Sequence, residues 1–410
     1  MKYYWLYLEP YSFIWRFKKN GLIYNTLTYE SIEFKNIGII KNIMDQIVDI
    51  KNMYCTKISE KELNNNLLRP FILKLKMKHS GGIIKCNSLY YKPVFLPPKL
   101  KFVPSIDNNN TEYRLSNNDN NKRYLKELNL YINGTCIHNC SGCQYNYKQT
   151  LFCTKSENKL SLEDIIRFTN QIDVYFLRRI NIIGGNIFNY NISELYFTLN
   201  KFPSLKMYHI NYRNANDGIT FINEFLNDNN RLNIMITFPV EESIFDSFFK
   251  KISQSFINYL FMVASIEEFN VTLRLIDKYN IDKYEIKPIY TGSNISFFMK
   301  YVFMSKNDII NTKLSRQQIF QKEVINSFDF GKITIKSDST VFANVNMPQL
   351  GTINTPLNEL LFNEINKGYS WKRTRIKFEP CSTCVYQLLC PSPSNYEIIL
   401  NKYNFCNIIN

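Results

Sequence analysis

The chain has 410 residues and a formal net charge of +15, and apolar residues make up 45% of it. This length allows two or three domains, and the apolar content argues against a disordered chain. No stretch has the roughly 18 uninterrupted apolar residues of a membrane span. The first residues lack the pattern of a secretory signal, and lysines form no block that predicts nucleic-acid binding. We therefore expect a cytoplasmic protein with no nucleic-acid or membrane partner.

Residues 1–98 are predicted to form a first unit of strands and short helices. Aromatic and aliphatic residues alternate with polar ones in WLYLEPYSFIW and GLIYNTLTYESIEF, as in hairpin strands. Two segments with helical spacing follow, the second with Pro70 near its start or at a break, and Gly81-Gly82 predicts a turn. This pattern indicates a winged-helix-like domain. The Pro- and Asn-rich residues 99–124 are predicted to be a linker.

Residues 125–300 alternate between strand-like and helix-like segments with short connections, which gives about six β/α units. The pattern predicts a parallel sheet, either open or curved into a partial barrel. In such sheets chemistry takes place at the carboxyl ends of the strands. A cysteine-bearing loop follows the first strand and Gly184-Gly185-Asn186 follows the second, so both are expected at one mouth. Residues 301–410 contain a predicted hairpin at 333–346 and a cysteine-rich tail.

The ten cysteines favour metal sites, because disulfides do not persist in a reducing cytosol. Cys136, Cys140 and Cys143 have the spacing C-x3-C-x2-C, which supplies three thiolates and leaves one metal position open. Zinc with His138 as a fourth ligand is an alternative, although the spacing differs from that of zinc fingers. The isolated cysteines at 55, 86 and 153 are predicted to be small buried hydrophobic residues.

The cysteine loop after the first strand resembles that of the radical S-adenosylmethionine (SAM) superfamily. The resemblance implies that Cys136, Cys140 and Cys143 hold a [4Fe–4S] cluster whose open iron binds SAM, which one electron then cleaves to methionine and a 5′-deoxyadenosyl radical. The segment 184–186 occupies the place of the family's Gly-Gly-Glu motif, which meets the methionine amino group. The residues expected to bind SAM are Gly142, Gly184, Gly185 and Asn186. Two of them depart from the pattern: Gly142 replaces an aromatic residue, and Asn186 replaces the acid.

The tail resembles the SPASM extension of peptide-modifying radical enzymes. The resemblance implies an auxiliary [4Fe–4S] cluster, and the same four thiolates also suit zinc. Two further cysteines of the extension are missing, with Asn344 and Ser394 in their places, so one auxiliary metal site is expected and not two. The four expected ligands are Cys381, Cys384, Cys390 and Cys406.

The family implies a function in peptide modification. Residues 1–98 would recognise the leader of a precursor peptide, and ferredoxin or flavodoxin would supply electrons. The motifs look most like the divergent pseudo-radical-SAM/SPASM branch of Bacteroidales-type peptide systems, so an alternative is a degenerate partner that binds peptide or transfers electrons for a sister radical SAM maturase. A structural zinc protein is a third hypothesis. Thr237 and Lys287 are minor candidates for the cofactor pocket, and no catalytic acid or base is predicted.

Overall fold

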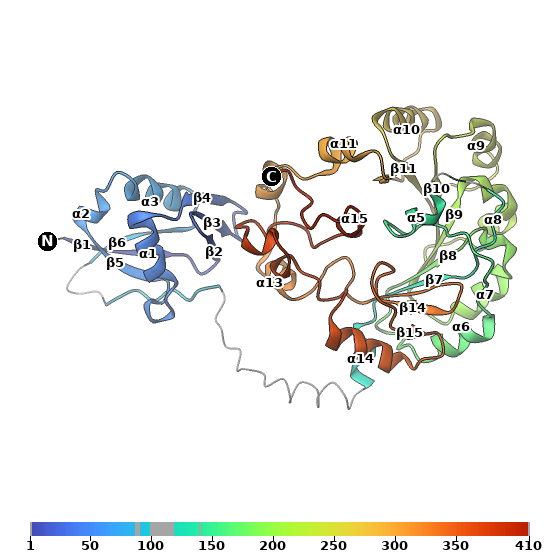
Figure 1. Cartoon of the computed structure of the whole chain (residues 1–410), viewed down its shortest axis with the longest axis horizontal. Helices are drawn as coiled ribbons and strands as arrows, with labels where there is room; N and C mark the ends of the chain where they lie inside the picture. Colours follow the sequence, from blue (N-terminus) through green and yellow to red (C-terminus); the bar gives the residue numbers. More distant parts are fainter. Residues whose placement is uncertain (1, 87–90, 99–118, 139, 141, 409–410) are drawn as a thin grey trace.

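The computed structural model describes residues 2–86, 91–98, 119–138, 140 and 142–408. Figure 1 shows a small N-terminal unit beside a larger unit, with part of the C-terminal segment between them. Most of the predicted linker, 99–124, lies outside the described residues. Its last part forms a 3₁₀ helix, η2 (Asp119–Tyr124). Within the described residues, no helix is both long and apolar enough to span a bilayer.

The N-terminal unit contains two antiparallel sheets of three strands each. One has the order β5 (Cys55–Ser59), β1 (Tyr3–Leu8), β6 (Gly81–Lys85), and the other has the order β2 (Ser12–Phe17), β3 (Asn20–Asn25), β4 (Ser31–Lys35). The helical segments are α1 (Gly38–Val48), η1 (Ile50–Asn52), α2 (Glu60–Leu63) and α3 (Leu68–Met77). The apolar faces of α1 and α3, with Leu63 of α2, share one core with the sheets. A sequence of strands and short helices is thus confirmed.

The glycine pair at 81–82 is not a turn, and that prediction is wrong. Both glycines begin β6, where they pair with Leu8 and Tyr7 of β1. A Cβ atom on Gly81 would lie 2.3 Å from the Tyr7 carbonyl oxygen, so glycine is needed for close approach of the two strands. The chain turns just before, at His79, which has a φ of 49°.

The larger unit is built on one sheet of nine strands. Its order is β12-β11-β10-β9-β8-β7-β13-β14-β15, in which β7 to β12 are parallel and follow the chain order. The predicted hairpin at 333–346 is present as β13 and β14. The strands are β7 (Glu127–Tyr131), β8 (Arg179–Ile183), β9 (Leu205–Asn211), β10 (Asn230–Ile236), β11 (Ile257–Val263), β12 (Tyr284–Pro288), β13 (Lys332–Ile335), β14 (Thr340–Phe342) and β15 (Gly351–Thr352).

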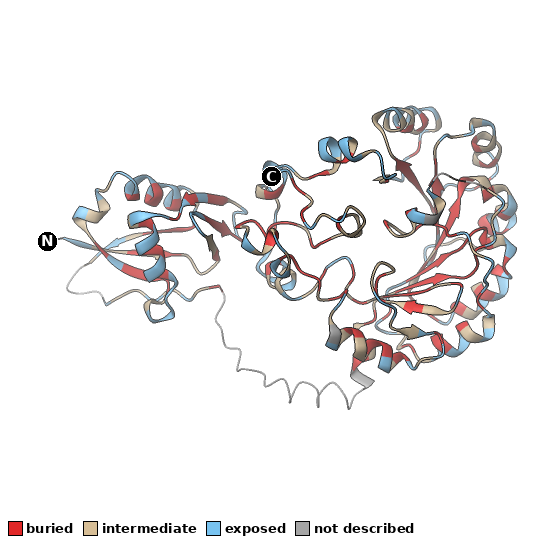
Figure 2. Ribbon diagram, in the orientation of Figure 1, coloured by how far each residue is buried: buried red, intermediate tan, exposed pale blue. Residues whose placement is uncertain are grey.

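Helices cover one face of this sheet, and the other face is turned toward the cysteine loop and the tail (Figure 1). The covering helices are α6 (Leu162–Thr169), α7 (Ile192–Leu199), α8 (Ile219–Phe225), α9 (Glu242–Phe249) and α10 (Ile266–Tyr279). Ser161 caps α6, because its side chain accepts from the Asp164 backbone N–H. Figure 2 shows buried residues along the strands and on the inward sides of the helices, which form the main core.

The opposite face of the sheet carries a row of hydrogen-bonded polar side chains. Asn181 Nδ2 donates to Asn129 Oδ1 at 2.7 Å, and His209 Nε2 lies 3.1 Å from Asn181 Oδ1. Burial lowers the pKa of His209 to about 3, so its ring is neutral at physiological pH. The full row, here called the amide row, is Thr334, Asn129, Asn181, His209, Asn233 and Asn258, one residue from each of six neighbouring strands.

The C-terminal segment packs against the N-terminal unit. Phe13, Leu22 and Tyr24 share an apolar cluster with residues 385–390 of the tail. The Tyr24 hydroxyl also accepts from the Leu314 backbone N–H at 2.7 Å. The short elements of this segment are α11 (Ile295–Phe297), the π-helical η5 (Phe298–Val302), α12 (Lys306–Ile310), α13 (Arg316–Val324), α14 (Leu357–Lys367), η6 (Arg375–Lys377), η7 (Cys381–Thr383) and α15 (Asn395–Ile399).

Candidate metal and cofactor sites

The loop of Cys136, Cys140 and Cys143 and the segment 184–186 lie together where β7 and β8 end. The Gly185 backbone N–H donates to the Asn133 carbonyl oxygen at 3.1 Å, and the Asn186 N–H donates to the Thr135 carbonyl oxygen at 2.6 Å. The Asn133 side chain adds a third link, because its Nδ2 donates to the Asn186 carbonyl oxygen at 2.8 Å. The two predicted motifs therefore form one structural unit at the carboxyl ends of neighbouring parallel strands.

The two glycines of this segment are required by close packing. A Cβ atom on Gly185 would lie 2.3 Å from the Thr135 carbonyl oxygen, and one on Gly184 would lie 2.2 Å from Asn133 Oδ1. Real Cβ atoms do not come this close to oxygen, so a larger residue would push the β8 turn away from the cysteine loop. The Gly185 carbonyl itself accepts from Asn214 Nδ2 at 3.3 Å.

Cys140 lies among donors from the ends of the next two strands. Arg213 Nη1 is 3.6 Å and Asn211 Nδ2 is 3.7 Å from its sulfur, and Thr237 Oγ1 is 4.0 Å away. Arg213 is also paired with Glu241 at 3.0 Å, which fixes its guanidinium at this mouth. One positively charged donor and two neutral donors therefore surround the Cys140 sulfur.

Cys143 contacts a fourth cysteine, Cys153, which was expected to be isolated. Cys153 is buried as predicted, but its thiol is hydrogen-bonded to Cys143. This contact lowers the pKa of Cys143 to about 7 and raises that of Cys153. Among the other isolated cysteines, Cys55 is buried as predicted, whereas Cys86 is only half-buried.

Asn186 is engaged on both sides of its amide. Its oxygen caps the short helix η3 (Ile187–Asn189) by accepting from the Phe188 N–H, and its nitrogen donates to the Asp217 carboxylate at 2.7 Å. Asp217 belongs to the helical turn η4 (Tyr212–Gly218) after β9 and is exposed. The structure thus places a carboxylate beside the segment 184–186, which has none of its own.

Gly142 and His138 have defined roles within the loop. Gly142 has a φ of 71° and precedes the short helix α5 (Cys143–Asn146). An aromatic residue would be strained in this left-handed conformation, so glycine suits position 142. His138 Nε2 lies 2.7 Å from Asn214 Oδ1, so this ring nitrogen is occupied by an amide.

A cavity of about 460 Å³ lies between the cysteine-loop segment, the sheet and the tail. Tyr147 comes from the segment after the third cysteine, Asn129 from the amide row, and Tyr396 from α15. Lys287 lines this cavity and is paired with Glu285 at 3.3 Å. Lys287 therefore lies apart from Thr237, the other minor candidate for the cofactor pocket, which is beside Cys140.

The four tail cysteines line one small cavity of about 10 Å³. Cys381, Cys390 and Cys406 are buried and Cys384 is half-buried. Burial raises the pKa of Cys384 to about 11 and that of Cys390 to about 12. In the described part of the chain, no group of three or more His, Cys, Asp or Glu side chains is already arranged to hold a metal ion.

A buried ion pair stands next to these tail cysteines. Arg375 Nη1 lies 2.7 Å from Glu397 Oε1 and 3.6 Å from the Cys381 sulfur. The two side chains are only 6% and 1% exposed. The guanidinium therefore has a carboxylate on one side and a thiol on the other. Its positive charge would offset the negative charge of tail thiolates.

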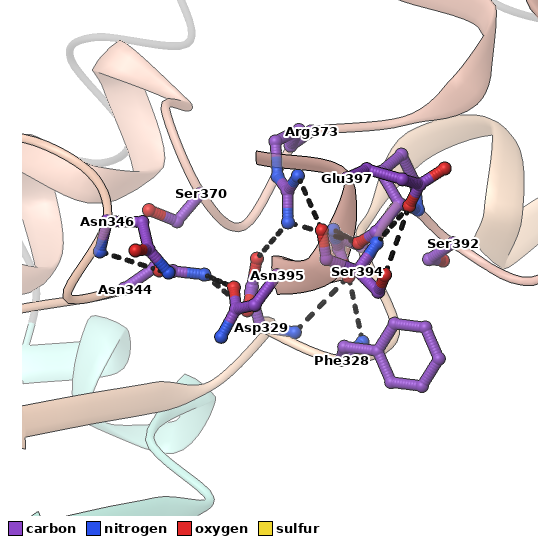
Figure 3. Close-up of polar contacts among 12 residues, drawn as sticks. Phe328, Asp329, Asn344, Asn346, Ser370, Arg373, Ser392, Ser394, Asn395 and Glu397 are labelled. Carbon is purple, nitrogen blue, oxygen red and sulfur yellow. Dashed lines mark hydrogen bonds and ion pairs between the residues drawn. The ribbon is translucent and has the colours of Figure 1, made fainter. Parts of the chain in front are cut away.

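Figure 3 shows that the two positions of the missing cysteines belong to one polar network. Asn344 Nδ2 donates to Asp329 Oδ1 at 3.0 Å and to Asn395 Oδ1 at 2.7 Å. Arg373 donates to Asp329 Oδ2 at 3.3 Å and to the Ser394 carbonyl oxygen at 3.2 Å. Hydrogen bonds between protein groups thus connect the places where the resemblance would put further thiolates.

Sequence reasoning missed several residues of these sites, among them Cys153, Arg213 and Asp217. The last two follow β9, which has no motif, and they reach the mouth only because β9 lies beside β8 in the sheet. Parallel topology was the one available signal, since it places every strand's carboxyl end at the same edge.

No protein-family model matches the chain, and no curated protein matches it. Among solved structures it is similar to Streptococcus suis SuiB bound to precursor peptide SuiA, with 13% identity and a TM-score of 0.48 over 98% of this chain and 99% of that chain. It is also similar to BtrN in complex with AdoMet and 2-DOIA, with 9% identity and a TM-score of 0.33 over 63% of this chain and 92% of that chain. Both scores are low, so the function proposed below rests on the residues of this chain.

Proposed function

We propose that this chain is a radical SAM enzyme that modifies a ribosomally made precursor peptide. The observation that carries the proposal is the joining of the C-x3-C-x2-C loop to the Gly-Gly-Asn segment at the ends of β7 and β8. Three thiols of this chain, Cys136, Cys140 and Cys143, would hold a [4Fe–4S] cluster. When bound, the cluster supplies the electron that cleaves SAM reductively. The sheet, with its six parallel strands in chain order, is consistent with a partial barrel.

The donor set of the loop fits such a cluster. Arg213 and Asn211 offset the negative charge at Cys140, and the lowered pKa of Cys143 favours its ligating thiolate form. Asp217 supplies the negative charge for the ammonium group of SAM that Asn186 lacks, and Asn186 holds that carboxylate in place. The 460 Å³ cavity beside Tyr147 is the proposed site of the peptide residue to be modified.

The tail would hold one metal on Cys381, Cys384, Cys390 and Cys406. The sulfurs of four cysteines around one small cavity suit either an auxiliary [4Fe–4S] cluster or a single zinc ion. Four thiolates would close its coordination, so its role would be structural. The network around Asn344 supports a single site in this region (Figure 3).

The N-terminal unit would act as the winged-helix-like element that recognises the peptide leader. Among the described residues β4 pairs only with β3, and beyond Ser31, whose carbonyl oxygen accepts from Lys78 Nζ, its outer edge would take an added strand. A cavity of about 780 Å³ lies along this strand. Ferredoxin or flavodoxin would be the electron donor.

A second candidate function is a degenerate partner that binds peptide for a sister maturase. It is favoured by the state of Asn186, whose amide oxygen already accepts from the Phe188 N–H and whose nitrogen already donates to Asp217. This partner would resemble the pseudo-radical-SAM/SPASM branch.

Anaerobic reconstitution with iron and sulfide, followed by an assay for 5′-deoxyadenosine, separates the two functions. The enzyme is expected to form 5′-deoxyadenosine from SAM with a chemical reductant, and Cys140→Ala is expected to abolish it. Cys86→Ala is the matched control, because this half-buried cysteine belongs to the N-terminal unit. A fully loaded protein that never cleaves SAM would refute the enzyme and support the partner.

A further inference from the structure

The 780 Å³ cavity is a groove between the N-terminal unit and the tail. One wall is formed by Phe34 of β4 together with Phe71 of α3. The facing wall consists of two short tail segments, 385–386 and 407–408. The walls are joined at one point, where the Glu33 carboxylate accepts from both Lys306 and the Tyr386 hydroxyl.

The chemistry of this groove selects an acidic, extended segment. Lys35, Lys74 and Lys306 line it together with a single carboxylate, Glu33, which Lys306 already neutralises at 2.7 Å. The open edge of β4 offers backbone groups to an added strand, and the phenylalanine rings offer apolar contact. A peptide that alternates acidic and apolar side chains would satisfy all three features.

Both tail segments of the groove follow a cysteine of the tail site without any intervening residue. Cys384 precedes Val385 and Tyr386, and Cys406 precedes Asn407 and Ile408. Ile408 lines both the groove and the small cavity between the four cysteines. The groove wall and the four sulfurs are therefore connected through adjoining residues and one shared side chain.

We propose that metal binding by the four tail cysteines sets the shape of the groove and thereby controls its affinity for an acidic, extended peptide segment. The inference rests on the proposed function, since it assigns a regulator to the peptide site. Four thiols that converge on one ion fix the backbone of their own segments, because binding energy at such sites is folding energy. Loading the tail with Zn²⁺ is expected to fix Tyr386 and Ile408 in contact with the peptide.

The test uses the full chain, purified anaerobically and either loaded with Zn²⁺ or stripped with a chelator. The probe is a fluorescein-labelled peptide of alternating Glu and Leu residues, and binding is followed by fluorescence anisotropy. We expect the loaded form to bind at least about tenfold more tightly than the stripped form. A peptide of alternating Lys and Leu residues is the control and is expected to bind neither form.

Hydrogen exchange provides a readout that needs no peptide. Loading with Zn²⁺ is expected to slow amide exchange in β4 and α3 as well as in the tail. Unchanged exchange in β4 and α3, or equal probe affinity in both forms, overturns the coupling. A probe that binds neither form also overturns it, because the groove would then not be the site. Formation of 5′-deoxyadenosine, which depends on the other cysteine loop, decides the proposed function separately.

A variant that keeps all four cysteines provides a test that remains valid if the metal-free tail unfolds. Ile408→Ala shortens the side chain shared by the two cavities and leaves the sulfurs in place. At unchanged zinc content it is expected to weaken probe binding several-fold. If circular dichroism shows that the stripped form has unfolded, this variant decides alone, and wild-type affinity in it would overturn the proposal.

Discussion

Glu397→Gln is expected to destabilise the tail strongly when the tail is free of metal. The Glu397 side chain is 1% exposed and lies 2.7 Å from the Arg375 guanidinium, which is 6% exposed. The change removes the negative charge and keeps the size, and it leaves the buried guanidinium with neutral partners such as the Cys381 thiol and the Pro391 carbonyl oxygen. Breaking a buried ion pair costs about 3–5 kcal/mol.

Zinc should reduce this cost. Thiolates held on the metal bring negative charge to the other side of Arg375, so the variant would lose mainly a charge-assisted hydrogen bond, worth about 1.5–3 kcal/mol. The two losses are measured by urea unfolding of wild type and variant, each zinc-loaded and zinc-free, with circular dichroism as the signal. Glu242→Gln is the control and should cause no measurable loss, because its ion pairs with Arg274 and Lys278 are exposed. Equal losses of unfolding free energy with and without zinc would show that the cysteine thiolates do not offset the charge of Arg375. A loss below about 1 kcal/mol would show that the ion pair does not stabilise the tail.

Four further changes test other parts of the structure. Cys153→Ala should move the alkylation midpoint of Cys143 in metal-free protein upward from about pH 7, because the thiolate loses a hydrogen bond; mass spectrometry of iodoacetamide labelling checks this, and an unmoved midpoint would contradict the contact. Gly185→Ala should lower the iron retained after reconstitution and cost about 1–3 kcal/mol, because its Cβ would meet the Thr135 carbonyl oxygen. Asp217→Asn should weaken SAM binding by about tenfold in equilibrium dialysis, whereas Asp228→Asn at an exposed site should not change it. Asn344→Ala should lower the melting temperature, since the loss of a donor to buried Asp329 costs about 1–3 kcal/mol; an unchanged melting temperature would mean that water replaces the amide.

The sequence predicted the strands and helices of the larger unit well, because each has a clear hydrophobic period and short connections. It also predicted that the cysteine loop and Gly184-Gly185 share one mouth, since both follow neighbouring parallel strands. Asp217 was not predictable, because only the pairing of β8 with β9 brings it to Asn186. Cys153 was misjudged as an isolated residue, because the chain folds back after α5 and returns its thiol to Cys143.

The first unit shows where local signals fail. Gly81-Gly82 has the composition of a turn, yet the structure uses it at the start of β6, since the Tyr7 backbone comes too close for any side chain. Turn propensity and close strand approach favour the same residue, and sequence alone does not distinguish them. The docking of Phe13 and Tyr24 onto the tail was equally hidden, because contacts between segments some 300 residues apart leave no periodic trace.

The amide row constrains how this sheet can vary. Each member is hydrogen-bonded to a member on a neighbouring strand. If one strand shifted by one residue, its polar side chain would point toward the helices, and the members beside it would lose a hydrogen-bond partner. Alignment of the strands is thus fixed by directional contacts as well as by apolar burial. Replacement of a single member should be tolerated poorly, and compensating changes should arise in adjacent strands together.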